Sequence, residues 1–236
     1  MPRPQDTDAR PHAPRSVLVA EAGRVRAGAP REAGAGTMAE VLDDVADALR
    51  AYDRLARASA GGGDGAPLEV WREAPDAEAA GGRRVAEALV VGLSGGGALP
   101  VALAGLPVRA GALAYAVIEV GDAAEGPATA DGLGAACEWM GLRWAGALLV
   151  PREGLVPGLL RHPRMGALRR PLSEATDDLI AAVRSGLTVA EAARLFSWEA
   201  RMPQGGHADL IVVRRSAASR LLIALFATLA GYRRSR

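Results

Sequence analysis

Apolar residues form short runs along the chain that are separated by stretches with helical spacing. The first run, SVLVA at residues 16–20, is rich in β-branched residues and has the pattern of a strand buried on both faces. Four later runs, one of them alternating, predict strands at residues 68–71, 88–92, 112–120 and 144–150. We therefore expect five strands.

The longest stretch with helical spacing runs from Met38 to Leu55. Its apolar residues recur every three or four positions, and its acidic residues come early and its arginines late, as the helix dipole favours. Thr37 and Glu40 have the spacing of a capping box at its start. This stretch predicts an amphipathic helix that packs on the sheet.

Shorter stretches of the same kind predict further helices. One ends near Gly141, one covers residues 171–186, and a short one over residues 99–106 begins near Pro100. Strands that alternate with helices in this way pair in parallel through right-handed crossovers. The sequence therefore predicts a three-layer, doubly wound α/β sheet with the strand order 2-1-3-4-5.

Ligands of such sheets bind beyond the carboxyl ends of the strands, at the point where the strand order reverses. In the order 2-1-3-4-5 this point lies between the first and third strands. Loops that contain glycine follow Ala20, Val91 and Val120, at or near the ends of the first, third and fourth predicted strands. We expect these loops to meet in one crevice.

The length of the chain, 236 residues, suits one α/β domain with a sizeable core. Residues 1–15 contain four prolines and almost no large apolar side chains, which predicts a disordered leader. The domain itself is expected over residues 16–203, and residues 204–236 are expected to form a basic and apolar helical extension. The net charge of +1 gives no reason to expect a nucleic-acid partner.

The numbers of cysteine and lysine residues limit the cellular locations and the kinds of binding site to be expected. Cys137 is the only cysteine, which excludes an internal disulfide, and no secretory apolar region follows the N-terminus, so we expect a cytoplasmic location. The chain has no lysine and no asparagine, a composition typical of a GC-rich genome such as an actinobacterial one, and without lysine it has no Walker-type phosphate loop. His12, His162 and His207 are too far apart to predict a metal site.

The stretch GLSGGGALP at residues 92–100 contains the spacing G-x-S-x-G, which in α/β-hydrolases exposes a nucleophilic serine. Ser94 would then be the nucleophile and His207 the base. Either Asp177 or Asp178 would supply the acid, in the chain order of those enzymes. A nucleophile elbow needs a helix directly after the serine, whereas three glycines follow Ser94. A serine hydrolase is therefore a minor alternative.

Four segments together resemble a known family. They are ALVVGLSGGGALPVAL, YAVIEVGDAAE, ACEWMGLRWAGALLVP and Arg201-Met202-Pro203, and their order and spacing are similar to those of the flavodoxin-like NAD(P)H-dependent oxidoreductases, which include FMN reductases. The resemblance covers about residues 16–203. It implies a flavodoxin-like fold, bound FMN, NAD(P)H as the electron donor, a small-molecule electron acceptor and a homodimer.

The same resemblance implies that the FMN phosphate lies on the loop after the first strand and the flavin ring between the third and fourth loops. The matching residues are Gly23, Arg24 and Thr37 at the phosphate, and Ser94, Gly95, Gly96, Gly97, Gly121 and Asp122 around the ring. No residue matches a catalytic acid or base. Gly95 and Asp122 stand where the family has aromatic residues, and the phosphate loop is longer than in the family. A non-catalytic protein of this fold, acting as a partner or scaffold, is therefore the alternative.

Trp139, Met140 and Trp144 lie at the junction of a predicted helix and a predicted strand. Residues at such junctions pack in the core more often than they line a flavin, so core packing is the expected role. Cys137 shares a helical face with Leu133 and Met140, and we expect it to be a small buried apolar residue rather than a redox-active thiol.

The last segment of the chain is basic and apolar. No acidic residue follows Asp209, and arginines flank the apolar run from Leu221 to Tyr232. This run is too short for a membrane-spanning helix, which needs about 20 residues. Two roles remain open for Leu221 to Arg236: a basic amphipathic helix that contacts anionic lipid or a protein partner, or a helix packed on the sheet or in a dimer interface.

Overall fold

The computed structural model describes residues 12–22, 35–61, 66–72, 85–94, 106–121, 124–152, 155, 160, 163–164, 166–196 and 208–213. In the helix that begins at Ala35, side chains are described from Met38 onward. The predicted leader up to Pro11, nearly all of the predicted helix over residues 99–106 and the C-terminal residues 214–236 lie outside these ranges. No helix in the described part of the chain is long and apolar enough to cross a lipid bilayer.

Strands and helices follow one another along the described chain. The strands are β1 (Ser16–Glu21), β2 (Glu69–Arg72), β3 (Ala86–Leu93), β4 (Val108–Val120), β5 (Arg143–Pro151) and β6 (Leu210–Val212). The helices are α1 (Ala35–Ser59), α3 (Glu125–Trp139), α4 (Arg170–Ser185) and α5 (Val189–Leu195).

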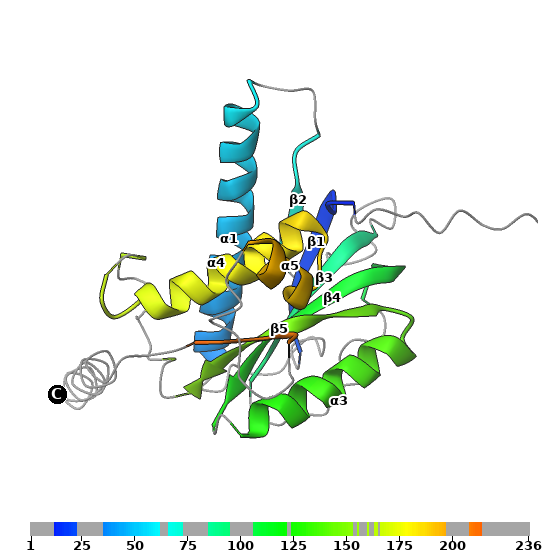
Figure 1. The fold of residues 1–236 in the computed structure, drawn as a ribbon, viewed down its shortest axis with the longest axis vertical. Coiled ribbons are helices and arrows are strands. Elements are labelled where there is room, and N and C mark those ends of the chain that lie inside the picture. The colour runs from blue at the N-terminus through cyan, green and yellow to red at the C-terminus, as the bar shows by residue number, and fades with distance from the viewer. Residues whose placement is uncertain are drawn as a thin grey trace, which may run out of the picture.

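The strands form one parallel sheet with the order β2-β1-β3-β4-β5-β6 (Figure 1). The predicted α/β class and the parallel pairing are confirmed. The predicted count of five strands is wrong, and the order 2-1-3-4-5 is incomplete, because β6 adds a sixth strand beside β5. β6 comes from the segment that the sequence analysis assigned to the C-terminal extension. It has only three residues, Leu210–Val212, and so short a run has no detectable periodicity.

Helices cover both faces of the sheet. Alternate residues of β1 show the division: Val17 and Val19 lie in a core shared with α1, α4 and α5, whereas Leu18 and Ala20 lie in a second core shared with α3. Figure 1 shows α3 on one side of the sheet and the other described helices on the opposite side. The predicted three layers are therefore present.

The long helix α1 packs on the sheet through the apolar face that the spacing predicts, with residues from Met38 to Leu49 fully buried along it. It begins at Ala35, so Thr37 lies inside its first turn and the capping box predicted at Thr37 is wrong. Its other end extends past the sheet, where Leu55 is 62% exposed (Figure 1).

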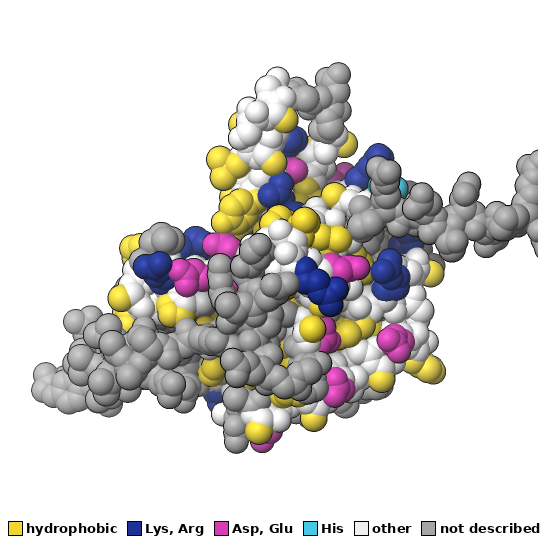
Figure 2. Space-filling model, viewed as in Figure 1, with side chains coloured by type: hydrophobic (Ala, Val, Ile, Leu, Met, Phe, Trp, Pro, Cys, Tyr) yellow, Lys and Arg dark blue, Asp and Glu magenta, His cyan; other side chains and the backbone are white. Residues whose placement is uncertain are grey.

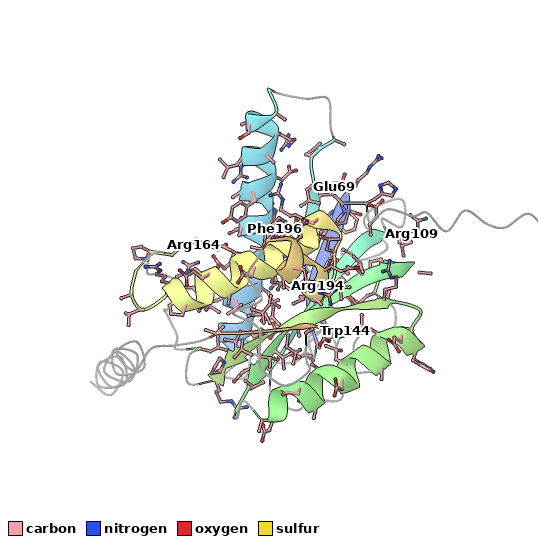
Figure 3. All side chains as sticks on the ribbon, viewed as in Figure 1. Glu69, Arg109, Trp144, Arg164, Arg194 and Phe196 are labelled. Atoms are coloured by element: carbon pink, nitrogen blue, oxygen red, sulfur yellow. The ribbon has the colours of Figure 1, made fainter. Side chains whose placement is uncertain are left out.

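Asp44 on α1 pairs with two arginines that precede α4. Arg164 Nη1 lies 2.9 Å from Asp44 Oδ2, and Arg169 pairs with Asp44 Oδ1. Arg164 also pairs with Asp177 on α4, and Figure 3 shows the Arg164 side chain beside the first turn of that helix. Because Arg169 is buried and Asp44 is half-buried, these ion pairs hold the start of α4 against α1.

Candidate functional site

The carboxyl ends of β1 and β3 lie side by side. Glu21, the last residue of β1, is in register with Gly92 near the end of β3, and the Ala22 N–H donates to the Gly92 carbonyl over 2.8 Å. The chain leaves β1 for α1 on one face of the sheet, whereas it leaves β4 for α3 on the other. The strand order therefore reverses between β1 and β3, and this edge is the candidate ligand site.

Two of the predicted site residues lie at this edge. Ser94 directly follows β3, Gly121 directly follows β4, and both are exposed. Because Leu93 is in register with Ile118, the two strands bring these residues to the same edge of the sheet. Thr37 is described only as backbone, in the first turn of α1. The other predicted residues lie outside the described ranges: Gly23, Arg24, Gly95, Gly96, Gly97 and Asp122.

Among the described residues, packing does not require a glycine at position 121. A Cβ atom there would meet Glu125 Oε2 at 3.7 Å and Arg152 Nη1 at 4.0 Å, which are ordinary contacts, and the backbone is not in the left-handed region. By contrast, a Cβ atom at Gly92 would meet Leu42 Cδ1 at 2.5 Å, so Gly92 is required by core packing. With respect to the part of the chain that the structure describes, the bare backbone at Gly121 leaves an open surface at the sheet edge, and such a surface suits the face of a flat ligand.

Charged side chains lie beside this surface. The Arg152 Nε–H donates to Glu119 Oε1 over 2.8 Å, and the Arg152 side chain is 61% exposed whereas that of Glu119 is 14% exposed. Glu125 is the first residue of α3 and is exposed. Glu21, at the end of β1, is buried with only 5% of its surface exposed. Within the described ranges, the edge therefore combines one arginine with three carboxylates that come from three different elements.

Four charged residues of this edge are not predicted from the sequence: Arg152, Glu119, Glu125 and Glu21. The sequence predicts a crevice formed by the loops after the first, third and fourth strands, whereas Arg152 directly follows β5. The signal available in the sequence was the position of each charged residue at or just beyond the end of an apolar run. Glu125 adds the position of an acidic residue at a helix N-terminus.

Comparisons with protein-family models, with curated proteins and with solved structures found no match to this chain.

Asp177, one of the acids considered for a serine hydrolase, lies between α4 and α1. Its carboxylate pairs with Arg164 and accepts a hydrogen bond from Tyr52. Burial raises the pKa of Asp177, and burial together with the Asp177 carboxylate raises the pKa of Tyr52. These partners tie Asp177 to α1, whereas Ser94 lies at the carboxyl end of β3. His207 lies outside the described residues.

Two of the three residues expected to pack at the junction of α3 and β5 do so. Trp144 and Met140 pack against the core beneath α3, and Figure 3 shows Trp144 between β5 and that helix. Trp139 is 79% exposed, so the prediction that it lies in the core is wrong. Trp139 is two positions beyond the buried Cys137, and two helical positions turn a side chain to the opposite side of the helix.

Cys137 is buried, as predicted, and burial raises the pKa of its thiol to about 11. It therefore stays protonated near neutral pH and has the character of an inert core residue. The described residues contain no group of three or more His, Cys, Asp or Glu side chains arranged to hold a metal ion.

An open groove of about 530 Å³ lies along α1, lined by residues that include Ala51, Tyr52 and Leu55, and by Arg164. Its lining includes no residue of the strand ends, so it is separate from the candidate site. Arginines and acidic side chains are interspersed over the visible face of the molecule rather than gathered in a patch of one sign (Figure 2). The lining of the groove likewise contains charged side chains of both signs.

Proposed function

We propose that this protein is an FMN-dependent NAD(P)H oxidoreductase of the flavodoxin-like type. The observation that carries the proposal is the meeting of Ser94 and Gly121 at the carboxyl edge of a parallel sheet, next to the point where the strand order reverses. The order of the four sequence segments that resemble the family supports the same function.

Each group of matching residues would have a separate task. Arg24 would pair with the FMN phosphate, and the backbone N–H groups at the start of α1, near Thr37, would add donors that favour an anion. Ser94, the glycines that follow it, Gly121 and Asp122 would surround the ring. FMN would supply the redox chemistry by accepting the electrons of NAD(P)H, and the chain would bind and orient it.

A second candidate function is a non-catalytic partner or scaffold with this fold. The observation that favours it is Glu21, a buried carboxylate directly before the loop that would hold the phosphate. An ionised carboxylate beside a phosphate dianion weakens its binding by charge repulsion. The absence of aromatic residues at Gly95 and Asp122 also removes a stacking contribution of about 1 kcal/mol for each ring contact.

Flavin binding by the purified full-length chain separates the two candidates. For the oxidoreductase we expect a yellow protein whose flavin absorption is released on denaturation, or a colourless protein that is stabilised by added FMN. At a hundredfold excess over Kd the stabilisation is about 2.7 kcal/mol. Oxidation of NADH or NADPH should then depend on the bound FMN and on an added electron acceptor.

A colourless chain that gains no thermal stability from excess FMN, and that oxidises neither NADH nor NADPH, would overturn the oxidoreductase and leave the scaffold. Size-exclusion chromatography with light scattering on the same sample tests the homodimer. We also keep the cytoplasmic location as a proposal, because the only cysteine of the chain is a buried free thiol.

A further inference from the structure

The side chains of Glu125 and Arg152 lie on either side of the backbone of Gly121, and we call this arrangement the charged cradle. From the position of a Cβ atom at Gly121, Glu125 Oε2 lies 3.7 Å away and Arg152 Nη1 lies 4.0 Å away. The two side chains come from different elements, since Glu125 begins α3 and Arg152 follows β5. A carboxylate and a guanidinium therefore flank one exposed stretch of backbone without pairing with each other at ion-pair distance.

Arg152 is positioned by Glu119, which accepts a hydrogen bond from Nε over 2.8 Å. This contact occupies one of the five N–H donors of the guanidinium, and the terminal nitrogens make no hydrogen bond or ion pair to any residue that the structure describes. Within the same ranges the Glu125 carboxylate also makes none, and only its backbone carbonyl accepts a hydrogen bond, from Thr129. Donors and acceptors at this edge are thus available to a ligand.

We infer that Arg152 and Glu125 form a donor and acceptor pair that recognises a planar ligand carrying a carbonyl group next to an N–H group. The inference rests on the proposed function, in which that ligand edge is the imide edge of the flavin ring. Arg152 donates to a ring carbonyl, Glu125 accepts from the ring N–H, and Gly121 allows the ring to approach the backbone.

Affinity measurements with two flavins test the pair. The full-length chain, Arg152→Gln and Glu125→Gln are titrated with FMN and with FMN methylated at the imide nitrogen, followed by flavin fluorescence. Hydrogen bonds to charged groups are strong, so we expect Arg152→Gln to weaken the binding of both flavins at least about tenfold. The unaltered chain should prefer FMN to the methylated flavin by a similar factor, and Glu125→Gln should reduce this preference, because its neutral amide oxygen is a weaker acceptor than a carboxylate.

Matched controls come from the opposite ends of the same elements. Arg143→Gln removes an exposed arginine at the start of β5, and Glu138→Gln removes an exposed carboxylate near the end of α3. Both should keep the FMN affinity and the preference for unmethylated FMN. Thermal unfolding of every variant without flavin shows that the fold is retained.

The outcomes separate the two proposals. A wild-type chain that binds no FMN overturns the oxidoreductase and, with it, the recognition pair. If FMN binds tightly, if Arg152→Gln leaves its affinity unchanged, and if wild type and Glu125→Gln prefer FMN over the methylated flavin equally, the recognition pair is overturned and the oxidoreductase proposal stands.

Discussion

Trp144 on β5 donates its indole N–H to the carboxylate of Asp209 over 2.7 Å, and this hydrogen bond joins the start of β5 to the turn before β6. The same indole lies against Gly134 of α3, where a Cβ atom would approach the ring to 3.3 Å. One side chain thus connects α3 and β5 with the turn that leads into β6.

We expect Asp209→Ala to lower the free energy of unfolding by about 1 to 2 kcal/mol, because the part-buried indole N–H of Trp144 loses a charged acceptor. Urea denaturation checks this. Asp131→Ala removes an exposed carboxylate on α3 and should change stability by less than about 0.5 kcal/mol. Equal effects of the two substitutions would show that the hydrogen bond contributes nothing.

Gly146 and Gly132 should respond in opposite directions to alanine. Gly146 has φ +121, and a Cβ atom there would lie 2.3 Å from the Asp209 carbonyl oxygen, so Gly146→Ala should cost about 3 kcal/mol or prevent folding. Gly132 lies on an exposed face of α3 with open space around it, so Gly132→Ala should stabilise by about 0.5 to 1 kcal/mol. Thermal unfolding of both variants decides, and a stable Gly146→Ala protein would contradict this account.

Asp44 and Asp47 lie on the same helix but in different environments. Asp44→Ala leaves the buried Arg169 without one of its partners, so we expect a loss of about 2 to 3 kcal/mol that persists in high salt. Asp47 is 78% exposed and pairs only with Arg50, so Asp47→Ala should cost less than about 0.5 kcal/mol. Denaturation at low and high salt measures both, and an Asp44 effect that vanishes in salt would argue against a buried network.

The thiol of Cys137 should make stability depend on pH in the alkaline range. Its pKa is raised from 9.0 to about 11 by burial, so the unfolded chain loses this proton more readily than the folded one. The contribution is fully present below about pH 9 and is lost as pH rises through about 11. Relative to Cys137→Ala, the wild type should therefore lose roughly 1 to 2 kcal/mol over this window. The prediction would be contradicted if the free energies of unfolding of wild type and Cys137→Ala, measured by urea denaturation, changed with pH in the same way.

The open surface at Gly121 separates ligand binding from folding. A Cβ atom at Gly121 meets only ordinary contacts among the described residues, so we expect Gly121→Ala to change stability by no more than about 0.5 kcal/mol in the absence of ligand. The added methyl group would occupy space of the proposed ring, and FMN affinity should fall at least about tenfold if the ring lies on this backbone. Thermal unfolding and FMN titration of the same preparation measure both effects. An unchanged FMN affinity would place the ring away from Gly121.

Elements that carry their own periodicity are predictable from the sequence. The buried face of α1 follows from the spacing of its apolar residues, and the first five strands follow from apolar runs. β6 does not, because three residues adopt a strand only when β5 offers a partner for their backbone. The start of α1 at Ala35 is also hidden, since helix ends depend on local backbone contacts more than on pattern.

The candidate site is predictable in the same partial way. Ser94 and Gly121 were expected there because loops after parallel strands meet at one edge. Arg152 and Glu125 were not expected, since their approach to Gly121 depends on the register of β4 with β5 and on the packing of α3. The prediction that Trp139 lies in the core was wrong for a related reason, because the rotation of α3 on the sheet decides which of its residues are covered.

The sequence by itself determined the parallel α/β class, the order of the first five strands and the edge where a ligand would bind, because these follow from periodic burial and from the handedness of crossovers. Only the tertiary structure decided the sixth strand, the ion pairs of Asp44 and the charged cradle at Gly121. Each of these joins residues far apart in the chain, and the free energy of such a contact depends on packing and register that no local pattern encodes.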